Sequence, residues 1–555
     1  MKRLLLLTTA LLAFSQIAHA QPAPLGGGSQ IQQIPRSPEA PQTLPDIRIE
    51  RGQAPATAEP AGPRIVVKTL HVTGETQFTE ADLIAATGFH PGLETDLAGL
   101  RAMAARISDF YGRHGYFVAQ AYLPAQTIEA GAVTIVVIEG HYGKVGLNNS
   151  AHVSDHLARS VLAGLDPGDI VASAPLERRL LLLSDLPGVR VASTLRPGEA
   201  VGTSDLLVNL TPGRRVTGSL EADNAGNPYT GEWRGGGTVN FNEPFGIGDV
   251  ASLRYLTAGD GLNYVRAAYQ ARVQDATLGV SYAFLDYHLG RQFAPLDARG
   301  TLNIASVFAS YPLIRSRDSN LYVLVDFDAK MFRDTVGATH SVIDRRIGVV
   351  NFGLSGDHHD HFLGGGWTTF TITGSVGDLD IRTPLTRATD AVTARSNGSY
   401  EKLSFDVTRL QQFAGPLSFY GEARGQLASK NLDSSEKMEL GGAYGVRAFP
   451  EGEAYGDEGY ILTLEARLRL GTLGERIGGH LQASAFVDYG EVKLNEDPWF
   501  SGPNDRTLSA AGVGLTWTDR RNLMLKVSYA FALSGHATSF PDHGGHLWLQ
   551  LSKFF

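Results

Sequence analysis

From Arg215 to the C-terminus, the chain divides into about sixteen short stretches in which polar and apolar residues alternate. One of these stretches sets Leu462, Leu464, Ala466, Leu468 and Leu470 against Thr463, Glu465, Arg467 and Arg469. Successive side chains of a strand point to opposite faces, so one face of each stretch is apolar and the other polar. A soluble β-sandwich would bury the apolar faces on a second sheet, which leaves charges confined to one face hard to explain. The pattern predicts a transmembrane β-barrel of about 16 antiparallel strands over residues 213–555, with lipid outside and water inside.

The connections between these stretches alternate in length. The short ones are 242–249, 274–277, 312–320, 355–366, 411–416 and 518–522. The long ones are 286–300, 333–345, 379–400, 429–458, 491–506 and 535–545. Bacterial outer-membrane barrels have short periplasmic turns and long extracellular loops. An even strand number then places both ends of the barrel, and any domain before it, on the periplasmic side.

The N-terminus has the three parts of a secretory signal peptide. Met1–Arg3 is basic, Leu4–Phe14 is apolar, and Ala18-His19-Ala20 is a small-residue cleavage pattern. Residues 1–20 are therefore predicted to be removed on export. No later run reaches the ~20 apolar residues that a spanning helix needs. The chain has no cysteine and a net charge of −9, which excludes disulfides and gives no basic nucleic-acid footprint.

Residues 21–63 contain nine of the chain's 26 prolines and few large apolar residues. Such a composition cannot form a core and predicts an extended or disordered linker. A short helix around Ser29–Ile34 has only weak support from the sequence.

Two small α/β units follow, at 64–139 and 140–212. The first has predicted strands at 65–72, 116–123 and 132–139, a helix capped by Thr79, and a second helix over 93–111. This second helix carries an apolar stripe, namely Leu97, Leu100, Ala104, Ile107 and Tyr111. The second unit has predicted strands at 144–147, 189–196 and 205–210, with helices at 154–165 and 175–184.

The final strand, 546–555, ends the chain on Phe555. Its apolar face holds Leu547, Leu549 and Leu551 and is interrupted by Lys553. An apolar terminal strand that ends in Phe is similar to the signal read by the outer-membrane assembly machinery. A lumen of about sixteen strands is too wide for wall side chains to fill, so we expect another segment to close it.

Several segments resemble one known family. These are Tyr116–Pro124, Val137-Ile138-Glu139-Gly140, Ser184–Val189, Ser193–Gly198 and the turn Asn242–Asp249. The chain resembles the two-partner secretion (type Vb) outer-membrane transporters of the hemolysin secretion/activation group. The resemblance implies two periplasmic polypeptide-transport-associated (POTRA) domains and a sixteen-stranded barrel. It also implies a pore in the bacterial outer membrane that recognises and secretes one large, unfolded partner exoprotein. An N-terminal helix can plug the pore in this family, but the proline-rich linker here shows little helical pattern.

The resemblance also implies a functional loop that folds back into the barrel. The matching loop residues are Val446, Arg447, Phe449, Glu453, Gly456, Asp457 and Gly459, and the barrel-wall residues are Phe486, Asp488 and Gly490. In the family, the arginine meets the wall aspartate. Strand parity independently places Asp488 in the lumen. It shares a face with Gln482, Ser484 and Phe486, and the opposite, apolar face is expected to meet lipid. Ala448 departs from the family's usual glycine, and a positive φ there would strain it.

Other motifs predict little chemistry. His358, His359 and His361 could suggest a metal site, but a solvated periplasmic turn is favoured. No Gly-x-Ser-x-Gly elbow or phosphate-binding loop stands out, so we expect a monomeric protein that is no enzyme and has no cofactor. Two alternative functions remain. A barrel-assembly factor of the same superfamily usually carries more periplasmic domains, and a passive porin would need none.

Overall fold

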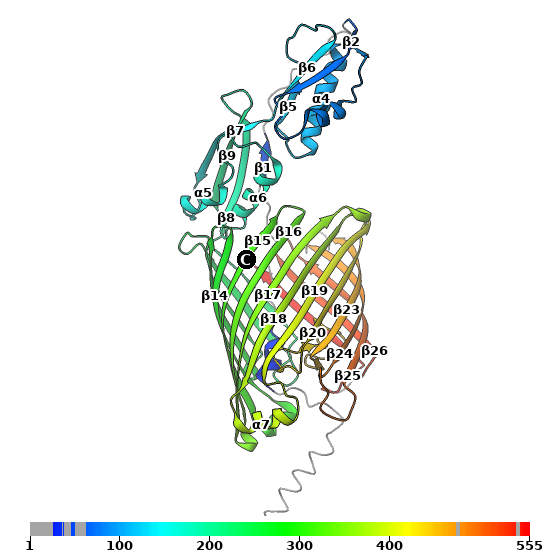
Figure 1. Ribbon diagram of the computed structural model, residues 1–555. Helices are drawn as coiled ribbons and strands as arrows, with labels where there is room; N and C mark the ends of the chain where they lie inside the picture. Colours follow the sequence, from blue (N-terminus) through cyan, green and yellow to red (C-terminus); the bar gives the residue numbers. More distant parts are fainter. Residues whose placement is uncertain (1–25, 36, 38–45, 50–62, 473–477, 540–543) are drawn as a thin grey trace, which may run out of the picture.

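The computed structural model describes residues 26–35, 37, 46–49, 63–472, 478–539 and 544–555. Figure 1 shows a tall barrel with two α/β units stacked beyond one end, and with the C-terminus at that same end. The predicted signal peptide, 1–20, lies outside the described residues. No helix within the described ranges is both long and apolar enough to cross a membrane.

Sixteen consecutive antiparallel strands form one closed barrel, which confirms the predicted fold class. They are β10 (Val216–Asp223), β11 (Arg234–Asn242), β12 (Val250–Thr257), β13 (Leu262–Val273), β14 (Ala276–His288), β15 (Ala298–Arg315), β16 (Ser319–Val336), β17 (Ser341–Asp360), β18 (Gly366–Ile381), β19 (Gly398–Ala414), β20 (Leu417–Ala428), β23 (Glu458–Thr472), β24 (His480–Lys493), β25 (Asp505–Thr518), β26 (Leu523–Ser534) and β27 (Gly545–Phe554). The first and last strands close the cylinder, with Ser219 opposite Phe554 and Asp223 opposite Gln550.

The two faces of the wall follow the sequence pattern. On β23, Leu462 and Leu464 are exposed on the outside, whereas Thr463 and Glu465 are buried inside. Because the barrel is closed, it has no edge strand with unpaired backbone N–H and C=O groups. A sheet that spans a membrane must be closed in this way, since lipid offers those groups no hydrogen-bond partners.

Several connections are shorter than the sequence predicts; the one at 312–320, for example, is reduced to 316–318. The expected long loop at 333–345 is reduced to residues 337–340, because β16 and β17 extend to either side of it. Gly337–Thr339 form a single 3-10 turn there. The expected turn at 355–366 shrinks to 361–365. The ends of these hairpins carry polar residues on both faces, so their sequence lacks the alternation of a strand and resembles that of a loop. Arg333 and Asp344, for example, are opposite each other across the extended hairpin and lie 3.8 Å apart.

The first α/β unit is built on a three-stranded sheet in the order β3-β6-β5. Its elements are β2 (Ile65–Val67), β3 (Thr69–Thr73), α3 (Glu80–Thr87), β4 (Leu93–Thr95), α4 (Leu97–Arg113), β5 (Gln120–Tyr122) and β6 (Ala132–Ile138). Thr79 caps α3 by accepting the Asp82 amide, as predicted. The predicted helix over 93–111 begins too early, because Leu93–Thr95 pairs with β2 and Asp96 caps α4.

The second unit contains β7 (His141–Asn149), α5 (Asp155–Leu162), α6 (Ser173–Ser184), β8 (Val189–Pro197) and β9 (Thr203–Pro212). Its core joins both helices to the sheet through buried leucines such as Leu180, Leu183 and Leu206. An additional strand, β1 (Asp46–Ile49), comes from the proline-rich segment and pairs in parallel with β8.

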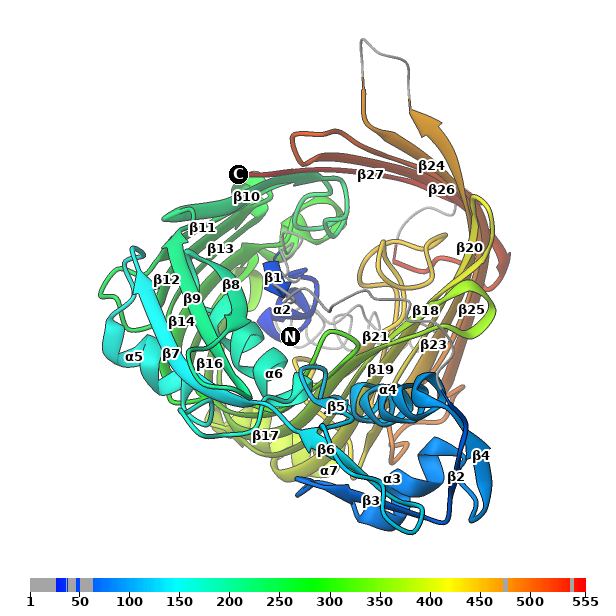
Figure 2. The ribbon, with the colours of Figure 1, turned by 90° about the horizontal axis from the view of Figure 1, so that it is seen from above.

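The same segment also forms a helix, which corrects the expectation of a linker with little helical structure. Helix α2 (Gly27–Gln32) lies inside the barrel ring, as the view along the barrel axis shows (Figure 2). It starts two residues before the weakly supported 29–34 helix. Six residues are too few for a stable isolated helix, so contacts with the lumen must hold it.

Candidate functional site: the inward loop and the lumen

The connection between β20 and β23 folds back into the barrel. Its two limbs pair as the short strands β21 (Met438–Glu439) and β22 (Tyr455–Gly456). Between this strand pair and the tip of the loop, the Leu440 amide donates to the Ala454 carbonyl at 3.0 Å. The loop is thus a compact hairpin whose tip, residues 446–449, reaches the inner wall.

Arg447 at the tip binds the wall through several contacts at once. Its Nε and Nη2 donate to the two carboxylate oxygens of Asp488 at 2.8 and 2.7 Å, and its Nη1 donates to Glu465 at 3.2 Å. The guanidinium carbon lies 3.3 Å from the centre of the Phe486 ring. The indole N–H of Trp548 donates to the Arg447 carbonyl at 2.7 Å. Asp488 is fully buried, and the bidentate pair fixes the tip to β24. Glu465 and Trp548 add contacts to β23 and β27.

Small residues let the tip approach the wall. A side chain at Gly490 would lie 2.4 Å from Leu440 and 3.2 Å from Val446. Phe449 packs in the same apolar cluster as Val446 and Phe486. The backbone φ of Ala448 is not positive. The family departure at this position therefore introduces no backbone strain.

Glu453 ties the returning limb to the last extracellular connection. Its carboxylate accepts the amide and hydroxyl of Thr538 at 2.7 and 2.8 Å, and those of Ser539 at 3.1 and 2.5 Å. Arg506 on β25 adds a fifth donor at 2.5 Å. Five donors to one buried carboxylate make this the best-anchored point of the loop after Arg447.

Asp457 anchors the base of the loop. Its carboxylate pairs with Lys437 at 2.7 Å and accepts the amides of Leu432 and Glu496 at 3.0 and 2.9 Å. Gly456 and Gly459 flank it where the chain rejoins the wall, and a side chain on either would collide with β24. The structure thus brings three of the predicted loop residues, Val446, Arg447 and Phe449, to the predicted wall residues Phe486, Asp488 and Gly490. Glu453, Gly456, Asp457 and Gly459 contact other parts of the chain. Phe555 lies elsewhere, at the periplasmic end, where its amide and that of Gly218 exchange backbone hydrogen bonds.

Helix α2 lies against both the loop and the wall. The Gly27 amide donates to Asp334 at 3.0 Å, and Arg234 donates to the Gln33 carbonyl at 2.8 Å. From the loop side, the Gln33 amide group donates to the Tyr455 hydroxyl at 2.6 Å. The helix and the loop together occupy the extracellular half of the lumen.

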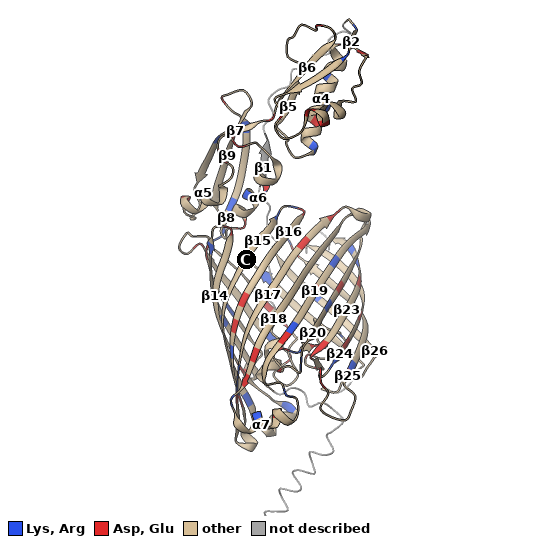
Figure 3. Cartoon of the chain, in the orientation of Figure 1, with Lys and Arg blue, Asp and Glu red and all other residues tan. Residues whose placement is uncertain are grey.

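Sequence analysis missed a set of buried ion pairs between the wall and the loop. Glu436 lies between Lys330 and Lys402 at 2.6 and 2.9 Å, and Arg345 pairs with Asp433. Figure 3 shows such charges spread along the barrel strands, between their ends. Strand parity predicts that Lys330 points inward. The loop partners have no periodic pattern, so no sequence signal could identify them.

The histidines at the end of β17 have structural neighbours. His359 stacks on Trp367 with ring centres 5.4 Å apart, and His358 contacts the Ser319 hydroxyl at 2.7 Å. Over the described ranges, no group of three or more His, Asp or Glu side chains is arranged to hold a metal ion.

Comparisons with known proteins agree with this architecture. The sequence model of the family described as "Haemolysin secretion/activation protein ShlB/FhaC/HecB" matches residues 202–517, and the ShlB-type POTRA domain matches residues 65–140. The heme/hemopexin transporter protein HuxB of Haemophilus influenzae is 28% identical over 471 residues, which cover 84% of this chain and 82% of HuxB. The outer membrane transporter CdiB of Dickeya dadantii is 24% identical over 528 residues, covering 92% and 90%.

Among solved structures, CdiB from Escherichia coli has a similar fold. Its TM-score is 0.71 at 20% identity, with 96% of each chain covered. The family match spans more than half of the chain. The chain therefore belongs to the haemolysin secretion/activation (ShlB/FhaC/HecB) family of outer-membrane transporters.

Proposed function

We propose that this chain secretes one large partner exoprotein across the outer membrane. The barrel is an outer-membrane transporter with its POTRA region in the periplasm. An unfolded substrate meets the POTRA domains first and adds a strand to an exposed sheet edge. This mode suits a disordered chain because backbone hydrogen bonds tolerate varied side chains.

The observed arrangement corresponds to a closed pore. The inward loop and α2 lie in the lumen, held by Arg447, Glu453 and Asp334. The substrate passes when these segments shift or rearrange. Folding of the exoprotein outside the cell supplies the direction, since a folded protein cannot return through the barrel.

The Arg447–Asp488 pair carries this proposal, because it fixes the tip of a loop that would otherwise be free in a wide lumen. In Arg447→Ala, a buried carboxylate loses its partner, which costs about 3–5 kcal/mol. We expect the variant to insert in the membrane but to secrete less partner protein.

The experiment measures partner protein in the medium, using the exoprotein encoded by the neighbouring gene. Heat-modifiable migration on gels shows whether the barrel is folded. Arg299→Ala removes an exposed arginine and is the matched control. Normal secretion by Arg447→Ala would contradict the role of the loop. Loss of many outer-membrane proteins on depletion, in place of one exoprotein, would indicate an assembly factor.

A further inference from the structure

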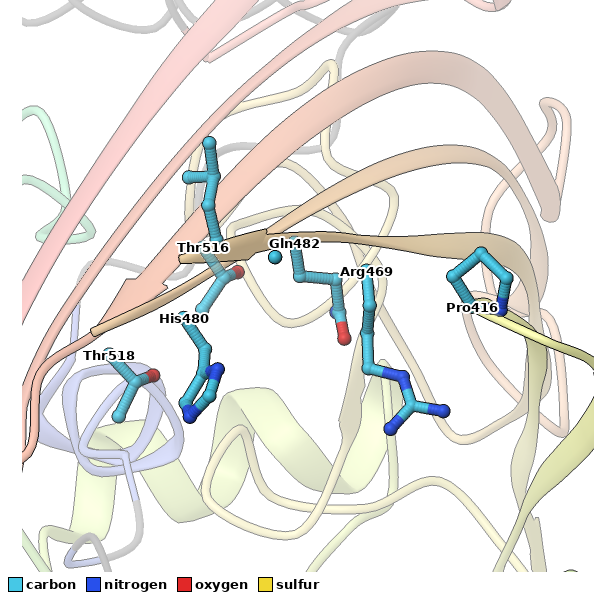
Figure 4. Close-up of a pocket in the computed structure, with 8 residues that line it drawn as sticks. Pro416, Arg469, His480, Gln482, Thr516 and Thr518 are labelled. Carbon is cyan, nitrogen blue, oxygen red and sulfur yellow. The ribbon is translucent and has the colours of Figure 1, made fainter. Parts of the chain in front are cut away.

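A cavity of about 480 Å³ lies on the inner wall of the barrel where β23, β24 and β25 meet the periplasm, and its lining mixes polar side chains with Pro416, Gly471 and Leu481. Its lining includes Arg469, His480, Gln482, Thr516 and Thr518. Figure 4 shows the side chains of Arg469, Gln482 and His480 projecting to the same side of the sheet.

Strand register places this cavity inside the lumen. Gln482 is opposite Arg469 on β23 and Thr516 on β25, and cross-strand partners share a face. Gln482 also shares its face with Asp488, six residues further along β24, which binds the inward loop. Because β23 ends at the periplasmic turn, the cavity lies just inside the periplasmic mouth, between that mouth and the loop tip.

Arg469 differs from Arg467, which lies two residues earlier on the same face of β23. Arg467 pairs with Glu465 at 2.9 Å, and Arg447 of the inward loop pairs with Asp488 on the wall. Within the described part of the chain, no carboxylate lies within ion-pair distance of Arg469, and its side chain donates a hydrogen bond of 3.3 Å to the Gly415 carbonyl. Its guanidinium is therefore available to a carboxylate from outside the chain.

The second α/β unit docks on the opposite side of the mouth. Arg178 on α6 donates to the carbonyls of Pro312 and Leu313, and Asp185 pairs with Arg315, so this unit is fixed above the β15–β16 turn. In the view along the barrel axis, the wall at β24–β26 is uncovered (Figure 2). A chain that passes beside this unit would enter along the uncovered wall and meet the cavity first.

We propose that this cavity is the first binding site on the barrel wall for the exported polypeptide and that it takes an extended segment with an acidic side chain. The inference rests on the proposed export function and names the chemistry of one step. Arg469 binds the carboxylate, while the amide of Gln482 and the hydroxyl of Thr516 bind the neighbouring backbone. A basic segment would be repelled by Arg469.

The test uses the full-length transporter in lipid nanodiscs and two synthetic peptides, one of alternating Asp and Ser and one with Asn in place of Asp. Calorimetry should show the Asp peptide binding roughly tenfold more tightly than the Asn peptide. Arg469→Gln should remove this difference, and Arg469→Lys should retain the preference for Asp. Arg520→Gln, an exposed arginine in a turn at the same end of the barrel, should change nothing.

Equal affinity of the wild-type protein for the two peptides would overturn the site. If Arg520→Gln lost the preference for the Asp peptide as fully as Arg469→Gln, the preference would reflect general electrostatic attraction at the mouth, which would also overturn the site. A preference for Asp that survives in Arg469→Gln would also overturn it. The readout is peptide affinity in purified protein, so failure of this site leaves the export function, tested through Arg447, unaffected.

Discussion

At the residue scale, the structure explains two buried carboxylates that the sequence singles out for different reasons. Asp488 was predictable because a motif and strand parity both place it in the lumen opposite an arginine. Glu139 was quoted only as part of a family motif. In the structure it accepts hydrogen bonds from Thr76 (2.6 and 2.5 Å), Gln77 (2.9 Å) and the Tyr111 hydroxyl (2.8 Å). These donors link β6 to the start of α3 and to α4, which no local pattern reveals.

The charge of Glu139 stabilises the first POTRA unit. Burial alone would raise the pKa of Glu139, but the hydrogen bonds from Thr76, Gln77 and Tyr111 lower it below the ordinary 4.5. A lowered folded-state pKa means that this stability is present above pH 4.5 and is lost as the pH falls through the folded-state value. Glu139→Gln should therefore cost about 2 kcal/mol at neutral pH and progressively less below pH 4.5.

Hydrogen exchange of residues 97–113 in the full-length protein measures this effect, with intrinsic rates corrected at each pH. Glu94→Gln, an exposed carboxylate in the same unit, is the control. A difference from wild type that stays constant from neutral to acid pH would refute the role of the charge.

At the element scale, the strands were predictable because one two-residue period repeats sixteen times in contact with lipid. Loop lengths at β16–β17 and β17–β18 were not, since a hairpin beyond the bilayer needs only backbone hydrogen bonds and accepts polar side chains on both faces. Helix α2 had only weak support from the sequence, as a helix around Ser29–Ile34, for a related reason. Its sequence, Gly27–Gln32, has weak helical propensity, and its position depends on partners hundreds of residues away.

The fit of α2 depends on a glycine. A side chain at Gly28 would lie 2.3 Å from the Ser434 hydroxyl and 2.7 Å from the Ser435 amide of the inward loop. Gly28→Leu should therefore displace the helix and raise the conductance of single channels in planar bilayers. Gly374→Leu adds the same side chain to a wall position with open space around it and should leave the conductance unchanged. An unchanged conductance in Gly28→Leu would show that α2 does not close the pore.

At the scale of the whole molecule, the second α/β unit is attached to the barrel mouth by ion pairs. Arg315 makes a bidentate pair with Asp185 at 2.7 and 2.9 Å, and Arg179 pairs with Asp275 at 3.2 Å. Neither pairing was predictable, because each joins this unit to a barrel turn about 100 or more residues away. The attachment is on one side of the mouth, and the wall at β24–β26 is uncovered in the view along the barrel axis (Figure 2).

Breaking the attachment should free the second α/β unit while leaving the barrel intact. The chain has no cysteine, so spin labels can be introduced at single cysteines in place of Arg159 on α5 and Arg520 in the β25–β26 turn. Pulsed electron resonance should give a narrow distance distribution in the labelled parent and a broader one in Arg315→Asp, where two carboxylates repel. Combining Arg315→Asp with Asp185→Arg re-forms the pair with opposite polarity and should restore the narrow distribution. A distribution that is equally narrow in Arg315→Asp would mean that the short 213–215 connection and the packing of the β11–β12 turn, and not the ion pairs, hold the unit over the mouth.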